Sequence, residues 1–333
     1  MRRFAWVLAR ILLGLVIAAA AAWGFFALWY RGPAPEGFKF ALCAAFALIG
    51  LVAVLQQFGK RRNFWVLAFA MTFGSLLIWW TSLEPPKDGN WSPDVARQTT
   101  GTIEGDTLKL ANVRGFEWHS KTDFTEKWAN ETYDLGKLQT LDIFLSYWGV
   151  PHMAHFILSF GFADGEYLAW SVEVKRERDG EFSPVADLFK ANPLIILATK
   201  EQDVVGVRSN IRDEDVHIFR MRAPPERARK LLEEYVREAN DLAERPRWYN
   251  SFSTNCTTVI FKMLRLAGEG VPFDWRVVVN GYLPEMMHDR GSVNTSVSSA
   301  QLRELGRIAP RALAVGLGPR FSEAIRQGVP LPD

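Results

Sequence analysis

The 333-residue sequence has few cysteines and almost no net charge, and these shortages exclude several classes of protein. Its only cysteines, Cys43 and Cys256, lie in an apolar stretch and in a stretch of mixed composition, so we expect no disulfide. With no CxxC pair, the sequence indicates no metal site, and we predict no cofactor. The formal net charge is +2 and Lys and Arg form no long run, which argues against nucleic acid as a partner.

Three apolar runs in residues 4–83 contain no acidic residue, which argues against a transport or proton path through them. They lie at about 11–30, 38–58 and 64–83, and each has the roughly 20 residues that cross a bilayer. We therefore predict a three-helix membrane anchor over residues 1–84. The alternative for the first run is a cleaved signal peptide. The run is too long for one, lacks a clear small-residue cleavage site, and precedes two more runs.

Basic residues predict the orientation of this anchor. The segments after the first run and after the third have no positive excess. The basic residues cluster before the first run and between the second and third: Arg2, Arg3, Arg10, Lys60, Arg61 and Arg62. The positive-inside rule then places the N-terminus in the cytoplasm and the chain after Leu83 outside it. We expect a multi-pass protein of the bacterial inner membrane. Residues 85–94 would be a linker, and 95–333 a periplasmic domain.

The stretch 246–268 places Cys256 at the predicted start of a helix. Ser253, Thr254 and Asn255 precede it and are typical N-cap residues. Apolar residues follow at helical spacing up to Gly268, a typical C-terminal stop. The backbone N–H groups and dipole at a helix start favour the nucleophilic thiolate. The alternative is a buried, unreactive cysteine.

A predicted β-hairpin brings a histidine and a glutamate together. Residues 155–162 alternate as a strand, 163–165 fit a three-residue loop, and 167–174 return as the partner strand. Counting back from this loop places Glu173 opposite His155, where its carboxylate would orient the imidazole. A two-residue loop would instead turn Glu173 to the other face of the sheet. Taken alone, each residue also fits a purely structural role.

Further elements are predicted from shorter patterns. Alternation predicts strands over 106–116, 203–208 and 216–221. An apolar stripe predicts a helix over 225–243, and shorter helices are expected within 273–287 and 299–327. Residues 140–148 are apolar with a mixed period, which favours neither type.

A cysteine at a helix start, a strand histidine and a nearby carboxylate are typical of thiol catalysis. Cys256 would be the nucleophile, His155 the base that accepts its proton, and Glu173 the group that orients the imidazole. The remaining candidates for oxyanion or substrate contact are the Cys256 N–H, Asn255, Tyr249 and Ser159.

Three motifs together resemble one domain family: HFILSFGF from His155, SVEV from Ser171, and WYN from Trp248 followed by NCTT from Asn255. They are similar to the family called DUF4105 or the Lnb N-terminal periplasmic domain, over about 91–328 of this sequence. The resemblance implies a lipoprotein N-acyltransferase that works through a cysteine thioester, with Cys256 as nucleophile and His155 as base. Glu173 matches no assigned position of the family.

A more distant resemblance concerns the order of these residues. A strand histidine followed much later by Asn-Cys at a helix start is similar to the permuted NlpC-type papain-like fold, which includes lecithin:retinol acyltransferase. One feature departs from the Lnb pattern. In that family the periplasmic domain comes first, whereas here three apolar runs precede it.

The sequence thus predicts an α+β protein. Three N-terminal transmembrane helices would precede a papain-like (permuted NlpC-type) thiol-enzyme domain with an antiparallel sheet and a helix carrying Cys256. The expected function is acyl transfer on a lipid-linked substrate, with membrane lipids and lipoproteins as partners. Two alternatives stay open: a papain-like cysteine peptidase or amidase of the cell envelope, and a non-enzymatic envelope scaffold. The sequence gives neither the oligomeric state nor the acyl donor.

Overall fold

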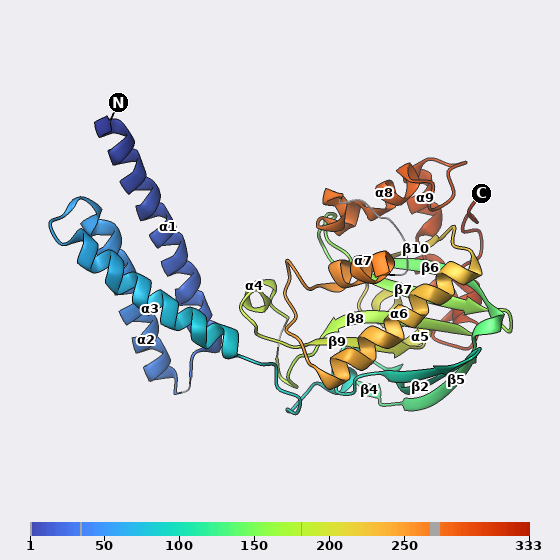
Figure 1. Ribbon diagram of the computed structural model, residues 1–333. Coiled ribbons are helices and arrows are strands. Elements are labelled where there is room, and N and C mark those ends of the chain that lie inside the picture. The colour runs from blue at the N-terminus through green and yellow to red at the C-terminus, as the bar shows by residue number, and fades with distance from the viewer. Residues whose placement is uncertain (1, 34, 181, 267–273) are drawn as a thin grey trace. The chain divides into compact units, whose positions relative to one another are not determined.

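The computed structural model describes residues 2–33, 35–180, 182–266 and 274–333 (Figure 1). The chain forms two compact units, one of Met1–Pro85 with Ser183–Ala191 and one of Pro86–Phe182 with Asn192–Asp333. The first contains long apolar helices and the second contains a mixed β-sheet with helices. The predicted α+β class is therefore confirmed.

Three long helices make up most of the first unit: α1 (Arg2–Arg31), α2 (Glu36–Leu55) and α3 (Arg62–Ser82). All three are long and apolar enough to cross a membrane, and they correspond to the three predicted runs with ends shifted by a few residues. Large apolar side chains on their surfaces are left exposed, as in Phe40 at 63% and Leu55 at 70%. Such surfaces are unfavourable in water and suit a lipid environment.

A short insertion between strands of the second unit belongs to the first. Residues Ser183–Ala191 carry the helical turn α4 (Pro184–Asp187). The Phe189 ring stacks on Tyr30 with centroids 5.6 Å apart, and Lys190 Nζ donates to the Trp80 carbonyl at 2.6 Å. These contacts pack the insertion against α1 and α3, which the sequence pattern did not predict.

An eight-stranded sheet is the centre of the second unit, with the order β1-β2-β9-β8-β7-β6-β10 and β5 paired to β2. Its strands are β1 (Thr100–Glu104), β2 (Thr107–Arg114), β5 (Trp128–Asp134), β6 (Leu138–Tyr147), β7 (His155–Phe162), β8 (Tyr167–Val174), β9 (Leu194–Thr199) and β10 (Asp215–Arg220). A separate pair is formed by β3 (Glu117–Trp118) and β4 (Phe124–Thr125). All strand pairs are antiparallel except β2–β9, so the sheet is mixed rather than wholly antiparallel as predicted.

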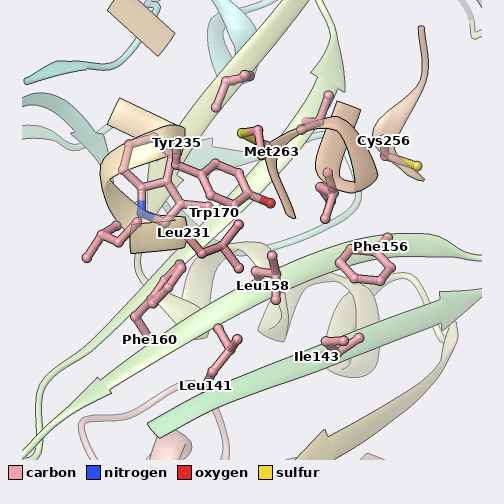
Figure 2. Close-up of a cluster of buried hydrophobic side chains, with 14 of the residues drawn as sticks. Leu141, Ile143, Phe156, Leu158, Phe160, Trp170, Leu231, Tyr235, Cys256 and Met263 are labelled. Atoms are coloured by element: carbon pink, nitrogen blue, oxygen red, sulfur yellow. The ribbon is translucent and has the colours of Figure 1, made fainter. Parts of the chain in front are cut away.

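Helices cover both faces of this sheet. The main helices are α5 (Glu201–Val204), α6 (Pro225–Glu244), α7 (Cys256–Leu266), α8 (Leu283–Asp289), α9 (Ser299–Gly306), α10 (Ala309–Val315) and α11 (Phe321–Ala324). Successive side chains of a strand point to opposite faces. Phe156 and Leu158 of β7 accordingly join the cluster packed on α6 and α7, which Figure 2 shows, whereas Ile157 joins the cluster with Phe321 of α11.

The predicted hairpin is confirmed with its three-residue loop. The Phe162 N–H donates to the Glu166 carbonyl at 2.9 Å, and Gly165 adopts a φ of +85°, which favours glycine. The last paired residues of β7 and β8 are Ile157 and Ser171. Continuing this register by two residues places Glu173 across from His155, as expected.

The strand predicted over 203–208 is wrong. The segment forms α5 and then a π-helical turn, Val207–Ile211. The fully buried Asp203 carboxylate accepts hydrogen bonds from Arg114 Nε at 2.8 Å and from the Phe116 N–H at 2.9 Å, and these distant partners favour the helical turn. A six-residue alternating segment contains no information about such partners.

The other predicted elements are present with shifted ends. The strands over 106–116 and 216–221 correspond to β2 and β10, and the helix over 225–243 corresponds to α6. The unassigned stretch 140–148 belongs to the ten-residue strand β6. The predicted helix end at Gly268 and the start at Phe273 lie outside the described residues.

Candidate active site

Cys256 is the first residue of α7, and Asn255 caps the helix. The Asn255 Oδ1 atom accepts the N–H groups of Thr257 and Thr258, both at 3.0 Å. Its Nδ2 donates to the Ser251 carbonyl at 2.9 Å. The predicted N-cap is confirmed, and the geometry assigns the Asn255 amide to the cap rather than to an oxyanion.

The Cys256 sulfur lies at the border between the core and a cavity. The residue is 8% exposed, and Figure 2 shows its sulfur at the edge of the apolar cluster, directed away from it. Burial acts to raise the pKa of the thiol. A hydrogen bond with His155, the positive charge of that ring and the backbone N–H of Phe156 outweigh burial and lower the pKa below its ordinary value. These surroundings therefore increase the thiolate fraction of Cys256.

His155 begins β7, and two polar groups hold one of its ring nitrogens. Its Nε2 lies 2.8 Å from Ser171 Oγ and 3.1 Å from Glu173 Oε1. The ring also hydrogen-bonds to Cys256. Because Nε2 is engaged by Ser171 and Glu173, we assign this contact to Nδ1. Burial acts to lower the pKa of His155. The charge of Glu173 and the hydrogen bonds with Cys256 and Glu173 overcome both burial and the opposing charge of Arg208, and raise the pKa to about 9.

Glu173 is held between His155 and Arg208. Its Oε1 accepts from Arg208 Nη2 at 2.9 Å and from Ser171 Oγ at 2.7 Å. Burial acts to raise the pKa of this carboxyl, but the charges of His155 and Arg208 lower it well below its ordinary value. Glu173 is therefore ionised at neutral pH and can stabilise an imidazolium.

Asn280 ties the strand of the base to the helix of the nucleophile. Its Oδ1 accepts the Ala154 N–H at 2.8 Å, and its Nδ2 donates to the Ala154 carbonyl at 2.6 Å and to Thr257 Oγ1 at 2.7 Å. Ala154 precedes His155 and Thr257 follows Cys256. One buried amide thus fixes the neighbours of both reacting residues.

A cavity of about 280 Å³ opens beside this cluster. Its wall contains apolar and aromatic side chains as well as arginines and glutamates. The lining residues are Trp148, His155, Val172, Glu173, Val174, Arg176, Phe182, Arg208, Arg212, Glu214, Tyr249 and Cys256. The structure therefore brings Cys256, His155, Glu173 and Tyr249 to one cavity.

Ser159 is the predicted site residue that the structure places elsewhere. It is fully buried, its hydroxyl donates to Glu201, and it does not line the cavity. Three residues of the site were missed: Ser171, Arg208 and Asn280. The position of Ser171 could have been predicted, because it lies two residues before Glu173 on the same strand and therefore on the same face of the sheet. No local pattern identifies the other two, because both reach the site from distant segments. Within the described part of the chain, no three His, Cys, Asp or Glu side chains are grouped to hold a metal ion.

Comparison with known families identifies the domain that carries this site. Residues 124–281 match the family model of the Lnb N-terminal periplasmic domain, a shorter stretch than the resemblance over 91–328 suggested. The match contains His155, Glu173, Cys256 and Asn280. No curated protein and no solved structure matches the chain. Residues 124–281 are thus similar to the Lnb N-terminal periplasmic domain, as the three motifs predicted, and they follow three helices that are long and apolar enough to cross a membrane.

Proposed function

We propose that this protein is a membrane-anchored periplasmic cysteine acyltransferase that acts on a lipid-linked substrate. The observation that carries the proposal is the electrostatic pairing of Cys256 and His155. The pKa of the thiol is lowered and that of the imidazole is raised to about 9, so that both shifts act in favour of a thiolate–imidazolium pair. Such a pair, open to a cavity, is what nucleophilic thiol catalysis requires.

The first half-reaction would form an acyl-enzyme. The Cys256 thiolate attacks an ester or amide carbonyl of the substrate. The cap leaves a donor for the resulting oxyanion: Asn255 accepts the N–H groups of Thr257, Thr258 and Val259, and among the described residues none accepts the Cys256 N–H. The imidazolium of His155 then gives its proton to the leaving oxygen or nitrogen as that bond breaks, which yields a thioester.

The second half-reaction would pass the acyl group on. An acceptor amine attacks the thioester carbonyl, the now neutral His155 takes the proton of the amine, and the Cys256 thiolate leaves. Glu173 stays ionised throughout and stabilises the imidazolium whenever it forms. Atoms and charge balance without a metal or a redox partner. Lipoproteins, whose N-terminal amines would be the acceptors, and membrane lipids are the partners that we propose.

Two features support a lipid-linked substrate. The cavity has apolar walls, including Trp148 and Phe182, which remain 42% and 46% exposed and could contact an acyl chain. The chain also carries three helices that are long and apolar enough to cross a bilayer, and such an anchor would keep the periplasmic domain close to lipid. Phospholipid acyl esters are therefore the donors that we expect.

The test is acyl-enzyme formation by the full chain in vesicles that contain phospholipid with labelled acyl chains. The wild type should acquire label that hydroxylamine releases, as a thioester does. The Cys256→Ala variant should acquire none, whereas Cys43→Ala, which removes the other cysteine, should label normally. Label retained in Cys256→Ala, or absent from the folded wild type, would argue against the proposal. Digestion of cell-wall peptides by the same preparation would support the peptidase alternative instead.

The inner-membrane topology is part of the same proposal. The basic residues in the N-terminal part of α1 and around the loop between α2 and α3 favour a cytoplasmic location for those ends. Alkaline phosphatase, which is active only in the periplasm, should be active when fused after Asp333 and inactive when fused within the 59–61 loop. The opposite result would reverse the assigned orientation.

A further inference from the structure

Three arginines line the cavity beside Cys256, and they differ in their partners. Arg176 binds both carboxylate oxygens of Asp94, at 2.8 and 2.7 Å. Arg208 binds Glu173 at 2.9 Å. The Arg212 guanidinium makes no hydrogen bond and no ion pair within the described part of the chain. Among the arginines that line the cavity in the described part of the chain, Arg212 is therefore the one whose charge is not paired directly with a carboxylate.

Arg212 is nevertheless held in place. Its guanidinium carbon lies 5.5 Å from the centroid of the Trp118 ring, in a cation–π contact. Stacking engages the flat face of a guanidinium and leaves the N–H edge able to donate. The segment that carries it is also fixed, because the Arg212 backbone N–H closes the π-helical turn on the Val207 carbonyl at 2.9 Å.

The surroundings leave this cation only partly compensated. Burial and the neighbouring charge of Arg208 act to lower the pKa of Arg212, and the charges of Glu214, Glu173 and Asp94 oppose this shift without restoring the ordinary value. Arginine stays protonated in proteins, so the cost appears as an unfavourable electrostatic energy rather than as loss of the proton. An anion that enters the cavity would relieve it.

We propose that Arg212 binds an anionic group, a phosphate or carboxylate, of the substrate that Cys256 attacks, and so selects acyl substrates that carry such a group near the scissile carbonyl. This inference rests on the proposed acyl transfer and specifies its substrate. Apolar walls that suit an acyl chain and a guanidinium that suits a phosphate lie in one cavity. Glycerophospholipids combine both features, because their phosphate is a few bonds from the acyl esters.

The first experiment measures anion recognition without requiring acyl transfer. Iodoacetate and iodoacetamide form the same bond with a thiolate and lose the same iodide, but only iodoacetate is negatively charged. We compare their alkylation rates at Cys256 of the full chain by mass spectrometry. The iodoacetate-to-iodoacetamide rate ratio should fall roughly tenfold in Arg212→Gln, in line with the loss of one charge-assisted hydrogen bond.

Two variants act as matched controls for this ratio. Arg212→Lys keeps the charge and should retain most of the wild-type ratio. Arg237→Gln removes an equal charge from an exposed position on α6, where the side chain is 67% exposed, and should leave the ratio unchanged. An unchanged ratio in folded Arg212→Gln, or an equal fall in Arg237→Gln, overturns the proposal.

The second experiment identifies the source of the anion. Dioctanoyl phosphatidylglycerol and dioctanoylglycerol carry the same acyl esters, and only the first has a phosphate. The wild type should form the Cys256 thioester faster with the phospholipid, and Arg212→Gln should lose that preference. A preference that survives in Arg212→Gln contradicts the assignment. Inorganic phosphate should slow iodoacetate alkylation only weakly. Strong protection by phosphate would make the ligand free phosphate and overturn the lipid selection.

The two proposals fail in different ways. Should neither lipid acylate Cys256 while the alkylation ratio still depends on Arg212, acyl transfer from these donors is wrong and the anion site stands. Should both lipids acylate Cys256 equally in the wild type and in Arg212→Gln, acyl transfer stands and the role of Arg212 is wrong.

Discussion

Replacement of Glu173 by glutamine tests the electrostatics of the site most directly, because it removes a charge and preserves the shape. In the wild type, the carboxylate opposes the effect of burial and helps to raise the pKa of His155 to about 9. Without that charge, burial dominates and the pKa of His155 falls. Loss of the imidazolium then raises the pKa of Cys256, so that less thiolate is present at neutral pH.

The size of the effect follows from the geometry. His155 Nε2 and Glu173 Oε1 are 3.1 Å apart. Two unit charges at that distance attract by about 5 kcal/mol at an effective dielectric constant of about 20. Arg208 shares the same oxygen at 2.9 Å and offsets part of this. The net value for a charge-assisted hydrogen bond is about 1.5–3 kcal/mol, so alkylation at neutral pH should be on the order of 10- to 100-fold slower.

The assay is the rate of iodoacetamide alkylation of Cys256 in the full chain, measured as a function of pH. The wild-type rate should rise below the ordinary pKa of a thiol, whereas the Glu173→Gln profile should be displaced to higher pH. The two should converge under alkaline conditions, where both thiols are ionised. Glu214→Gln is the matched control. Glu214 lines the same cavity and is similarly buried, but it contacts Ser146 and Arg208 rather than His155.

Two results would refute this reasoning. If the Glu173→Gln profile superimposes on that of the wild type, Glu173 does not control the protonation of the pair. If Glu214→Gln displaces the profile equally, the effect comes from the general potential of the cavity and not from the contact with His155.

Three further substitutions test the support of the site. Asn280→Ala removes the amide that joins Ala154 to Thr257. It should destabilise the fold by about 1–3 kcal/mol, measured as a lower melting temperature, and it should slow Cys256 alkylation. An unchanged alkylation rate would contradict the bridging role. Asn255→Ala should lower the free energy of unfolding by about 1 kcal/mol through loss of the helix cap. Asn255→Asp can still cap the helix and should lower the free energy of unfolding by less. Equal losses in the two variants would contradict the capping role of Asn255. Arg326→Met removes the partner of the buried carboxylates of Asp142 and Glu201 and should lower the free energy of unfolding by about 3–5 kcal/mol. The pH profile of Cys256 alkylation in the folded protein should stay unchanged. A displaced profile would show that this ion-pair network affects the site.

The part of the site that lies within one hairpin could be predicted from the sequence. Strand register depends on loop length and side-chain alternation, and both can be read locally. For this reason the relative positions of His155 and Glu173 could be predicted from the sequence. The Asn255 cap could be predicted for a similar reason, because capping residues directly precede the helix. The same alternation contains Ser171, two residues before Glu173, although its role was not recognised.

The rest of the site depends on tertiary contacts that no local pattern encodes. Arg208 lies in a segment that alternates like a strand, yet buried partners of Asp203 turn that segment into a helix and a π-turn. Asn280 reaches Ala154 from 126 positions away in the sequence. Features of the site that depend on such long-range contacts could not be predicted from the sequence. They include the ion pairs of Arg176 and Arg208 and the position of Arg212 in the cavity wall.

The three-residue loop of the hairpin has a consequence for how this protein can vary. Its residues, Ala163 to Gly165, are exposed, and surface turns usually tolerate insertions and deletions. The loop lies seven residue pairs, or about 24 Å, from the pair of His155 and Glu173. If loop length alone set the register, a change of one residue would rotate Glu173 to the opposite face of the sheet, but pairing of β8 with β9 and its buried side chains oppose that rotation. A solvent-exposed turn and a buried strand pairing about 24 Å away from it in register thus act together to keep a carboxylate beside the imidazole.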